Sequence, residues 1–396
     1  MTPRPVRGPA ARLFAFAALL WLGACGAVQL PGTGAGAQGG QRIDPTAPVQ
    51  VALLVPGNSP IQGDATIARD LENAARLAIA DLQGAQIDLR VYPTGASPAQ
   101  AATIAQQAVA DGAKIILGPL RADTSAAASA AVAAQNVNVL AFSNNTAIAG
   151  GNLFILGPTF ENTAVRLSRY AAAQGIGRVF VAHGQDAQGE AGRDAVAEAA
   201  QRSGVTFAGS EAYPVTSQQA VLEAAPAVSA AIDAAGADGV FLTGGINADL
   251  PIISSALRES GTTLQQAPFL GLTRWDSLAA AATQSALQGS YFAKPSEGLE
   301  ASFRARFEAA YGNAPHPVAG LAYDGIAAIG ALVAQGDPDA LTGASLTQAA
   351  GFTGTSGIFR LRSDGTNERG LAIAQIRDNQ VVIVDPAPSS FGGAGL

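Results

Sequence analysis

Polar side chains gather at points where predicted strands of this chain end. In open α/β sheets, ligands bind outside the carboxyl ends of the strands. Hydroxyl, amide and charged groups placed there can hydrogen-bond a small polar ligand. The sequence therefore predicts a ligand-binding cleft. Its candidate residues are Asp123, Thr124, Ser125, Asn144, Asn145, Thr146, Gln188, Ile246, Arg274, Trp275 and Asp276.

Several of these residues also have a purely structural interpretation. Asp, Thr and Ser at 123–125 are typical of a helix N-cap. The pair Asn144-Asn145 is typical of a turn. Trp275 fits either a cleft wall or an interface anchor. His183 follows a strand and fits a cleft position, whereas His316, between two prolines, fits a surface loop.

No motif for catalysis, a cofactor or a metal is present. The sequence has no G-x-S-x-G elbow and no phosphate-binding loop. One Cys and two His cannot supply a usual zinc site. The formal net charge is −7 and no basic block occurs, which argues against a nucleic-acid partner. We therefore expect a protein that is not an enzyme and needs no cofactor.

The N-terminal segment has the pattern of a secretory signal. Three arginines precede an apolar run over 13–22, which is too short for a membrane span. The run ends in Leu22-Gly23-Ala24-Cys25, which resembles the bacterial lipobox. That resemblance implies a signal peptide over 1–24 and a lipid on Cys25, the only membrane attachment expected. Gly26, in place of Asp, favours the outer membrane, and residues 25–47 are expected to form a flexible tether.

The body of the chain alternates short β-branched runs with alanine-rich helical stretches. This order predicts an α/β fold with parallel sheets covered on both faces. The pattern restarts after residue 156, so we expect two doubly wound lobes joined by a hinge. Strands are predicted over 49–55, 87–92, 114–117, 137–142, 178–182, 207–213, 239–243 and 268–271.

The last hundred residues predict elements that interleave the lobes. A strand over 290–295 is expected to return to the first unit, followed by helices over 299–312 and 319–335. Segments 357–362 and 371–384 predict a hairpin. The expected division is 48–159 with 289–340 for the first lobe, 160–288 with 341–386 for the second, and a disordered tail over 387–396.

This ordered set of segments resembles the type I periplasmic-binding-protein fold, in the leucine/isoleucine/valine-binding group. The resemblance covers about 48–385 and is carried by four segments. These are Val51 to Pro56, Ile115-Ile-Leu-Gly-Pro-Leu120 with Asp123-Thr124-Ser125, Val139 to Thr146, and Phe303 to Pro315 with Ala322-Tyr323-Asp324.

Within that group the chain is most similar to the penicillin-binding protein activator lipoproteins. The segments that carry this similarity are Gly271-Leu-Thr-Arg-Trp275-Asp276, Gly289-Ser-Tyr-Phe-Ala293, and Gly357-Ile-Phe-Arg360 with Glu368-Arg369-Gly370-Leu371. The resemblance implies an outer-membrane lipoprotein that faces the periplasm and stimulates a peptidoglycan synthase.

The same resemblance offers an alternative, a receptor of an ABC importer for amino acids or related small polar ligands. Receptors of that group hold a substrate carboxylate with a Ser or Thr hydroxyl and a helix N-terminus, where Asp123 here replaces Ser. The carboxylate that would hold the substrate ammonium is Asp276. A structural envelope lipoprotein without a ligand is the third hypothesis.

Overall fold

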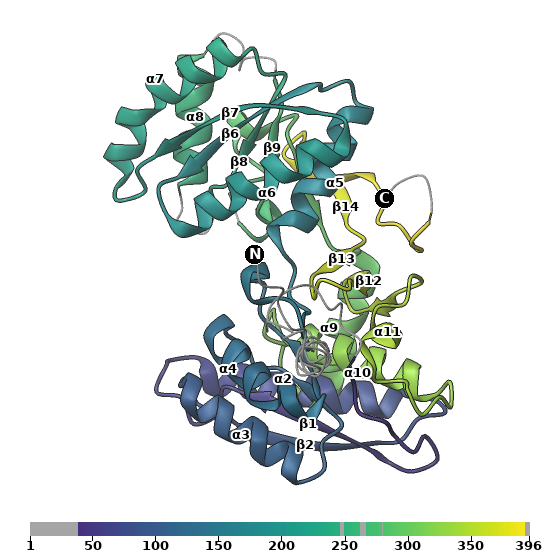
Figure 1. The fold of residues 1–396 in the computed structure, drawn as a ribbon. Coiled ribbons are helices and arrows are strands. Elements are labelled where there is room, and N and C mark those ends of the chain that lie inside the picture. The colour runs from purple at the N-terminus through teal and green to yellow at the C-terminus, as the bar shows by residue number, and fades with distance from the viewer. Residues whose placement is uncertain (1–38, 246–248, 262–266, 279, 393–396) are drawn as a thin grey trace, which may run out of the picture. The chain divides into compact units, whose positions relative to one another are not determined.

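The computed structural model describes residues 39–245, 249–261, 267–278 and 280–392. Two lobes are present, each built on its own sheet with helices on both faces (Figure 1). Two parallel-sheet lobes are what the alternation of strands and helices predicts. None of the helices in these residues is both long and apolar enough to span a membrane.

The first lobe contains a parallel sheet of five strands in the order β2-β1-β3-β4-β5. The strands are β1 (Val49–Val55), β2 (Ile87–Pro93), β3 (Ile115–Leu117), β4 (Asn138–Ala141) and β5 (Leu153–Ile155). The helices are α2 (Asp64–Asp81) and α10 (Gly320–Val333) on one face, and α3 (Pro98–Ala110) and α4 (Ala122–Val132) on the other. In β1, Leu53 points to the first face and Leu54 to the second, as strand periodicity requires.

The second lobe contains a seven-stranded sheet in the order β15-β14-β10-β9-β8-β6-β7. Its strands are β6 (Arg178–Gly184), β7 (Thr206–Tyr213), β8 (Gly239–Leu242), β9 (Phe269–Gly271), β10 (Tyr291–Lys294), β14 (Ala372–Arg377) and β15 (Gln380–Asp385). Helices α5 (Phe160–Ala173) and α6 (Ala187–Ser203) cover one face. Helices α7 (Gln218–Ala235) and α8 (Leu250–Ser260) cover the other.

Two parts of the expected division between the lobes are wrong. The strand predicted to return to the first unit, β10, instead pairs with β9 and β14 in the second sheet. The chain returns to the first lobe only afterwards, with α9 (Glu297–Tyr311) and α10. Residues 341–361 were expected in the second lobe, but Leu341, Leu346 and Phe359 are buried in the first-lobe core.

The C-terminal region forms a three-stranded antiparallel sheet and a separate hairpin, where a single hairpin was predicted. A small antiparallel sheet contains β11 (Phe352–Gly354), β12 (Gly357–Leu361) and β13 (Asn367–Arg369). The turn at 362–366, between the two segments predicted as one hairpin, joins β12 to β13. The separate hairpin joins β14 to β15 through Asp378 and Asn379, with φ angles of 53° and 61°. Two successive positive φ values are typical of a tight type I′ turn.

Both ends of the described chain lie against the body. The predicted tether was expected to reach residue 47, but Ile43 is buried in the first-lobe core and its N–H donates to the carbonyl of Pro338. At the other end, the Arg360 guanidinium lies 4.6 Å from the ring centre of Phe391. The expectations of a flexible tether and a disordered tail are therefore wrong for residues 39–47 and 387–392. Cys25 lies outside the described residues.

Candidate ligand-binding site

The first group of predicted site residues lies in the first turn of α4. The Thr124 hydroxyl donates to the carbonyl of Arg121 at 3.0 Å, and the Ser125 hydroxyl donates to that of Pro119 at 3.2 Å. Both side chains are buried, while Asp123 is exposed and accepts from the Thr124 N–H at 2.7 Å. The N-cap itself is Arg121, without a side-chain cap. The N-cap interpretation of 123–125 is therefore wrong, because the helix begins two residues earlier. The two hydroxyls instead hold the turn that leads from β3 into α4.

Arg121 forms an ion pair that joins two helix starts of the first lobe. Its guanidinium lies 2.7 Å from Oδ1 of Asp64, the first residue of α2. Burial alone would raise the pKa of Asp64, but hydrogen bonds from Arg121 and Ser59 and the charge of Arg121 together lower it. The guanidinium is partly exposed at the carboxyl end of β3, and one hydrogen bond to Asp64 leaves it further N–H donors. Arg121 is absent from the residues predicted for the site.

The second group forms a turn after β4. The Asn145 N–H donates to the Ser143 hydroxyl at 3.1 Å, and the Asn145 side chain accepts from the Ala147 N–H at 3.0 Å. The turn interpretation is therefore confirmed for Asn145. Asn144 is exposed, and the Thr146 hydroxyl donates to Glu161 on α5 at 3.0 Å.

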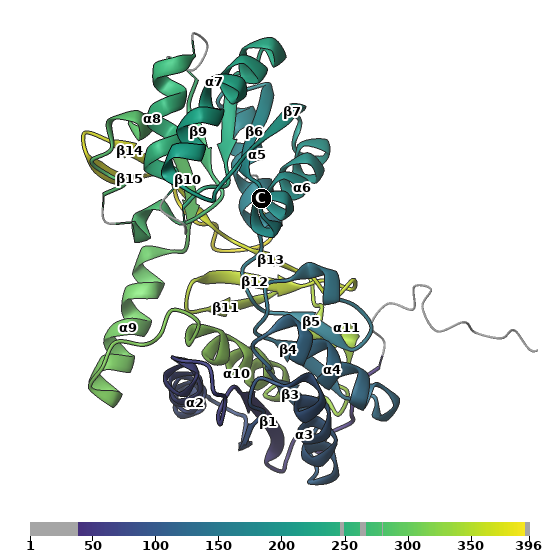
Figure 2. The same cartoon turned by 90° about the vertical axis from the view of Figure 1, so that its left-hand side faces the viewer.

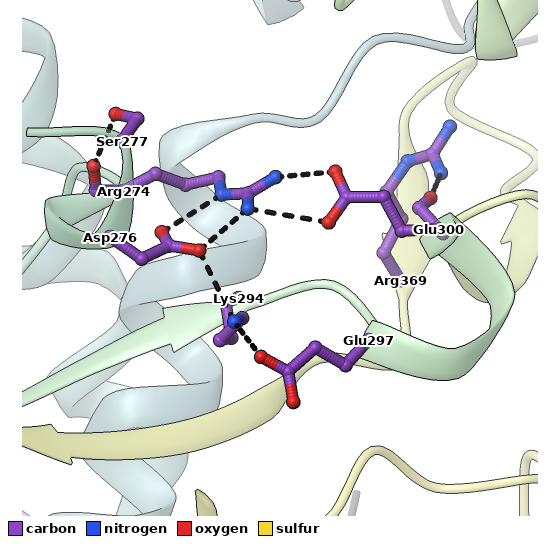
Figure 3. A network of polar contacts seen from close by, with 8 residues as sticks. Arg274, Asp276, Ser277, Lys294, Glu297, Glu300 and Arg369 are labelled. Atoms are coloured by element: carbon purple, nitrogen blue, oxygen red, sulfur yellow. Dashed lines mark hydrogen bonds and ion pairs between the residues drawn. The ribbon is translucent and has the colours of Figure 1, made fainter. Parts of the chain in front are cut away.

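The third group forms a charged network at the end of β9 (Figure 3). Arg274 donates to Asp276 from Nε at 3.1 Å and from Nη2 at 2.7 Å. Lys294 Nζ, at the end of β10, lies 3.2 Å from Asp276 and 2.7 Å from Glu297. Asp276 is therefore already neutralised by two cations of the chain. Its predicted role, holding a substrate ammonium, is not available in this arrangement.

Acidification is expected to reduce the stability of the folded chain through Asp276. Burial acts to raise its pKa, but Arg274 and Lys294 outweigh this and lower it. The unfolded carboxyl therefore binds a proton at higher pH than the folded one does. Its stabilising contribution is present above about pH 4 and is lost as the pH falls through the lower folded pKa.

Urea unfolding at a series of pH values from about 6 down to about 2 tests this expectation, because the contribution of Asp276 is lost below the unfolded pKa of about 3.9. Asp276→Asn should flatten the loss of stability on acidification. An equal slope in the variant and the wild-type chain would contradict it.

Trp275 belongs to the core of the second lobe. The residue is 0% exposed, and its ring centre lies 5.8 Å from that of Phe292. Both predicted roles, cleft wall and interface anchor, are therefore wrong. The indole occupies the space beside Gly271, where a Cβ atom would lie 2.3 Å from Cε2 of the indole. Sequence alone did not show this, because a tryptophan beside two charged residues has the composition of a surface turn.

The remaining predicted positions lie apart from these groups. Gln188 is half-buried in the first turn of α6, which Asp186 caps by accepting from the Gly189 N–H at 2.7 Å. His183 is buried, with Nδ1 3.2 Å from the carbonyl oxygen of Gly184. Ile246 lies outside the described residues.

The predicted residues form separate groups. Across the described ranges, no hydrogen bond, ion pair or ring contact joins a predicted first-lobe residue to a predicted second-lobe residue. A cavity of about 180 Å³ includes one of them, Thr146, and is lined mainly by α5, α6 and the turn between β12 and β13. In the part of the chain that the structure describes, no group of three His, Cys, Asp or Glu side chains is placed to hold a metal.

A buried polar network lies where the chain crosses between the lobes. The Asn367 side-chain amide donates to the carbonyls of Ile155 and Gly157 at 2.9 and 2.8 Å. Arg369 donates to the carbonyl of Leu156 and lies 3.4 Å from Asp324. These bonds thus hold the segment that crosses between the lobes after β5 against the segment that crosses after β13.

The sequence matches the family model described as periplasmic binding protein over residues 48–380. No curated protein matches the chain. Among solved structures, a putative branched-chain amino acid ABC transporter protein from Rhodospirillum rubrum has a TM-score of 0.69 and 19% identity, covering 85% of this chain and 100% of its own.

Two further structures have similar coverage. The leucine-, isoleucine-, valine-, threonine- and alanine-binding protein from Brucella ovis has a TM-score of 0.59 and 18% identity, covering 83% of this chain and 90% of its own. A solute-binding protein from R. palustris in complex with benzoate has a TM-score of 0.54 and 16% identity, covering 88% and 99%. These likenesses show the fold.

The family consists of non-catalytic receptors, which confirms the expectation that this chain is not an enzyme. Two doubly wound lobes with several crossing segments are the architecture of its type I members. The chain therefore belongs to the periplasmic binding protein family.

Proposed function

We propose that this chain is the solute-binding receptor of an ABC importer in the cell envelope. The observation that carries the proposal is the family match over 48–380 together with two lobes linked by crossing segments. Lobes joined in this way can close around a ligand and release it by a hinge motion. Solved structures of this fold are named as amino-acid or benzoate binders, so small carboxylates are the first ligands to test.

The charged groups at the strand ends favour a carboxylate over an ammonium. Among the described residues, Arg121 has donors beyond the one that binds Asp64. It lies beside the start of α4, where backbone N–H groups and the helix dipole favour an anion and the exposed carboxylate of Asp123 opposes one. Asp276 is bound by Arg274 and Lys294, so it does not offer a free negative charge. We therefore include carboxylates without an amino group beside the free amino acids.

Titration with a library of amino acids and simple carboxylates tests the proposal. Calorimetry gives the affinity, and the shift of the melting temperature gives a second signal. A bound ligand at about 100 times its Kd should stabilise the fold by about 2.7 kcal/mol.

Arg121→Gln is expected to weaken binding of the hit by about tenfold or more, because it removes a charge-assisted donor. Arg90→Gln, at an exposed arginine paired with Asp88 on β2, is the matched control and should leave the affinity unchanged. If no compound in the library shifts the melting temperature at millimolar concentration, the receptor proposal fails.

The lipid anchor is a separate part of the proposal. Cys25 ends the lipobox-like segment, and Gly26 favours the outer membrane. Mass spectrometry of the N-terminal peptide from membrane-extracted protein should show diacylglycerol and an acyl chain on Cys25. An unmodified mature N-terminus would contradict the anchor.

Regulation of a peptidoglycan synthase stays a prediction of the sequence similarity. One observation reduces its support, because Trp275 is buried and cannot anchor a partner in this arrangement. Co-purification from membranes, followed by a glycosyltransferase assay, separates the two functions. A bound and stimulated synthase would favour the activator role over the importer.

A further inference from the structure

Helix α9 is shared between the two lobes (Figure 2). It begins directly after β10, a strand of the second-lobe sheet. Farther along the helix, Phe303 and Phe307 are buried in the first-lobe core, and the Tyr311 hydroxyl donates to the carbonyl of Asn73 on α2 at 2.9 Å. The body of α9 therefore belongs to the first lobe although its chain leaves the second.

The first turn of α9 is held to the second lobe by a bidentate ion pair. Arg274 Nη1 lies 2.8 Å from Glu300 Oε1, and Nη2 lies 3.3 Å from Oε2 (Figure 3). Asp276 accepts from the other edge of the same guanidinium. Asp276 therefore fixes the orientation of the guanidinium that donates to Glu300. The side chains of Arg274 and Glu300 are 39% and 34% exposed, so water and salt can reach them.

This geometry makes the ion pair sensitive to rotation between the lobes. If α9 moves with the first lobe, its pivot is the short connection at 295–296. Glu300 lies about 6 Å along the helix from that pivot, at about 1.5 Å per residue. Even a modest rotation therefore carries its carboxylate away from Arg274, and a bidentate pair tolerates little displacement.

We propose that the Arg274–Glu300 pair is a latch that restrains rotation of the two lobes and opens as they move. The inference rests on the proposed function only in assuming that the lobes rotate. Its test uses no ligand, so failure of the latch and failure of ligand binding are separate results.

Pulsed electron paramagnetic resonance between two spin labels measures the restraint. The labels are placed on exposed positions of different lobes, Ala99→Cys on α3 and Gln218→Cys on α7. The full chain carries Cys25→Ser, so no other thiol is present. Glu300→Gln keeps the size of the side chain and removes its charge. The distance distribution in this variant should broaden by about twofold, because states that the pair disfavours become populated.

Two comparisons make the result specific. Glu72→Gln breaks an ion pair that lies entirely within α2. In that pair, Nη2 of Arg76 lies 2.8 Å from Oε1 of Glu72, and both side chains are partly exposed. This matched control should leave the width unchanged. The unmutated pair in about 1 M salt, where the screening length is about 3 Å, should broaden as Glu300→Gln does. An unchanged width in Glu300→Gln, or equal broadening in Glu72→Gln, overturns the latch.

Discussion

Replacing Asp324 with alanine is expected to lower the free energy of unfolding by about 3–5 kcal/mol, the usual result of removing one partner of a buried ion pair. Asp324 on α10 is 0% exposed, and its Oδ1 accepts from the Thr355 N–H at 2.6 Å. Its other oxygen lies 3.4 Å from Nη1 of Arg369. Without Asp324, the guanidinium would remain buried beside the crossing segments with no counter-ion.

The two groups depend on each other because both side chains are buried. Burial raises the pKa of Asp324 and lowers the pKa of Arg369, in each case against the charge of the partner. The double variant Asp324→Ala/Arg369→Leu removes both charges. It should therefore recover part of the stability that the single variant loses.

Urea unfolding followed by circular dichroism measures these differences. The control is Asp339→Ala, which breaks an exposed pair with Arg42 at 3.2 Å and should cost about 1 kcal/mol or less. A loss below about 1 kcal/mol in Asp324→Ala would show that the pair does not hold the crossing segments together.

Local patterns predicted most of the elements in this fold. The strand expected over 49–55 has the bounds that the structure shows, and the helix expected over 319–335 agrees with α10 to within two residues at each end. Each is defined by its own residues, a β-branched apolar run in one case and alanine-rich helical periodicity in the other. The restart of the pattern after residue 156 also predicted the second lobe.

The lobe to which a late strand belongs was not predictable in the same way. Strand β10 has an apolar pattern that suits either sheet. Its place beside β9 follows from Phe292, which packs against Trp275 in the second-lobe core. That contact joins residues 17 positions apart and leaves no mark on the local sequence.

The sequence predicted that the candidate residues lie at strand ends, but it did not predict the residues with which they form ion pairs. Strand ends identified Arg274 and Asp276, because parallel strands present their carboxyl ends at one edge. The residues that form ion pairs with such strand-end residues lie far from them in the sequence. Glu300 lies 26 positions from Arg274, and Asp64 lies 57 positions from Arg121. A single sequence contains no signal for such pairs.

Trp275 provides the second large expected effect. Replacing it with alanine should lower the free energy of unfolding by about 3–5 kcal/mol, the usual cost of removing a buried aromatic side chain. Because the indole fills the space between Gly271 and Phe292, its loss would leave a cavity in the second-lobe core. The exposed Leu222, with 48% of its surface accessible, is the control, and Leu222→Ala should change the stability by less than about 0.5 kcal/mol.

Replacing Trp275 with phenylalanine separates the effect of ring packing from the effect of the indole N–H. In the described residues, the indole N–H of Trp275 is buried without a hydrogen-bond partner. Trp275→Phe removes that unsatisfied donor while keeping a ring against Phe292, so it should cost much less than alanine. Because the side chain is buried in the core, ligand affinity should be the same in Trp275→Phe and the wild-type chain. Calorimetry with the same ligand checks this, and a selective loss of affinity at unchanged stability would instead identify Trp275 as a ligand contact.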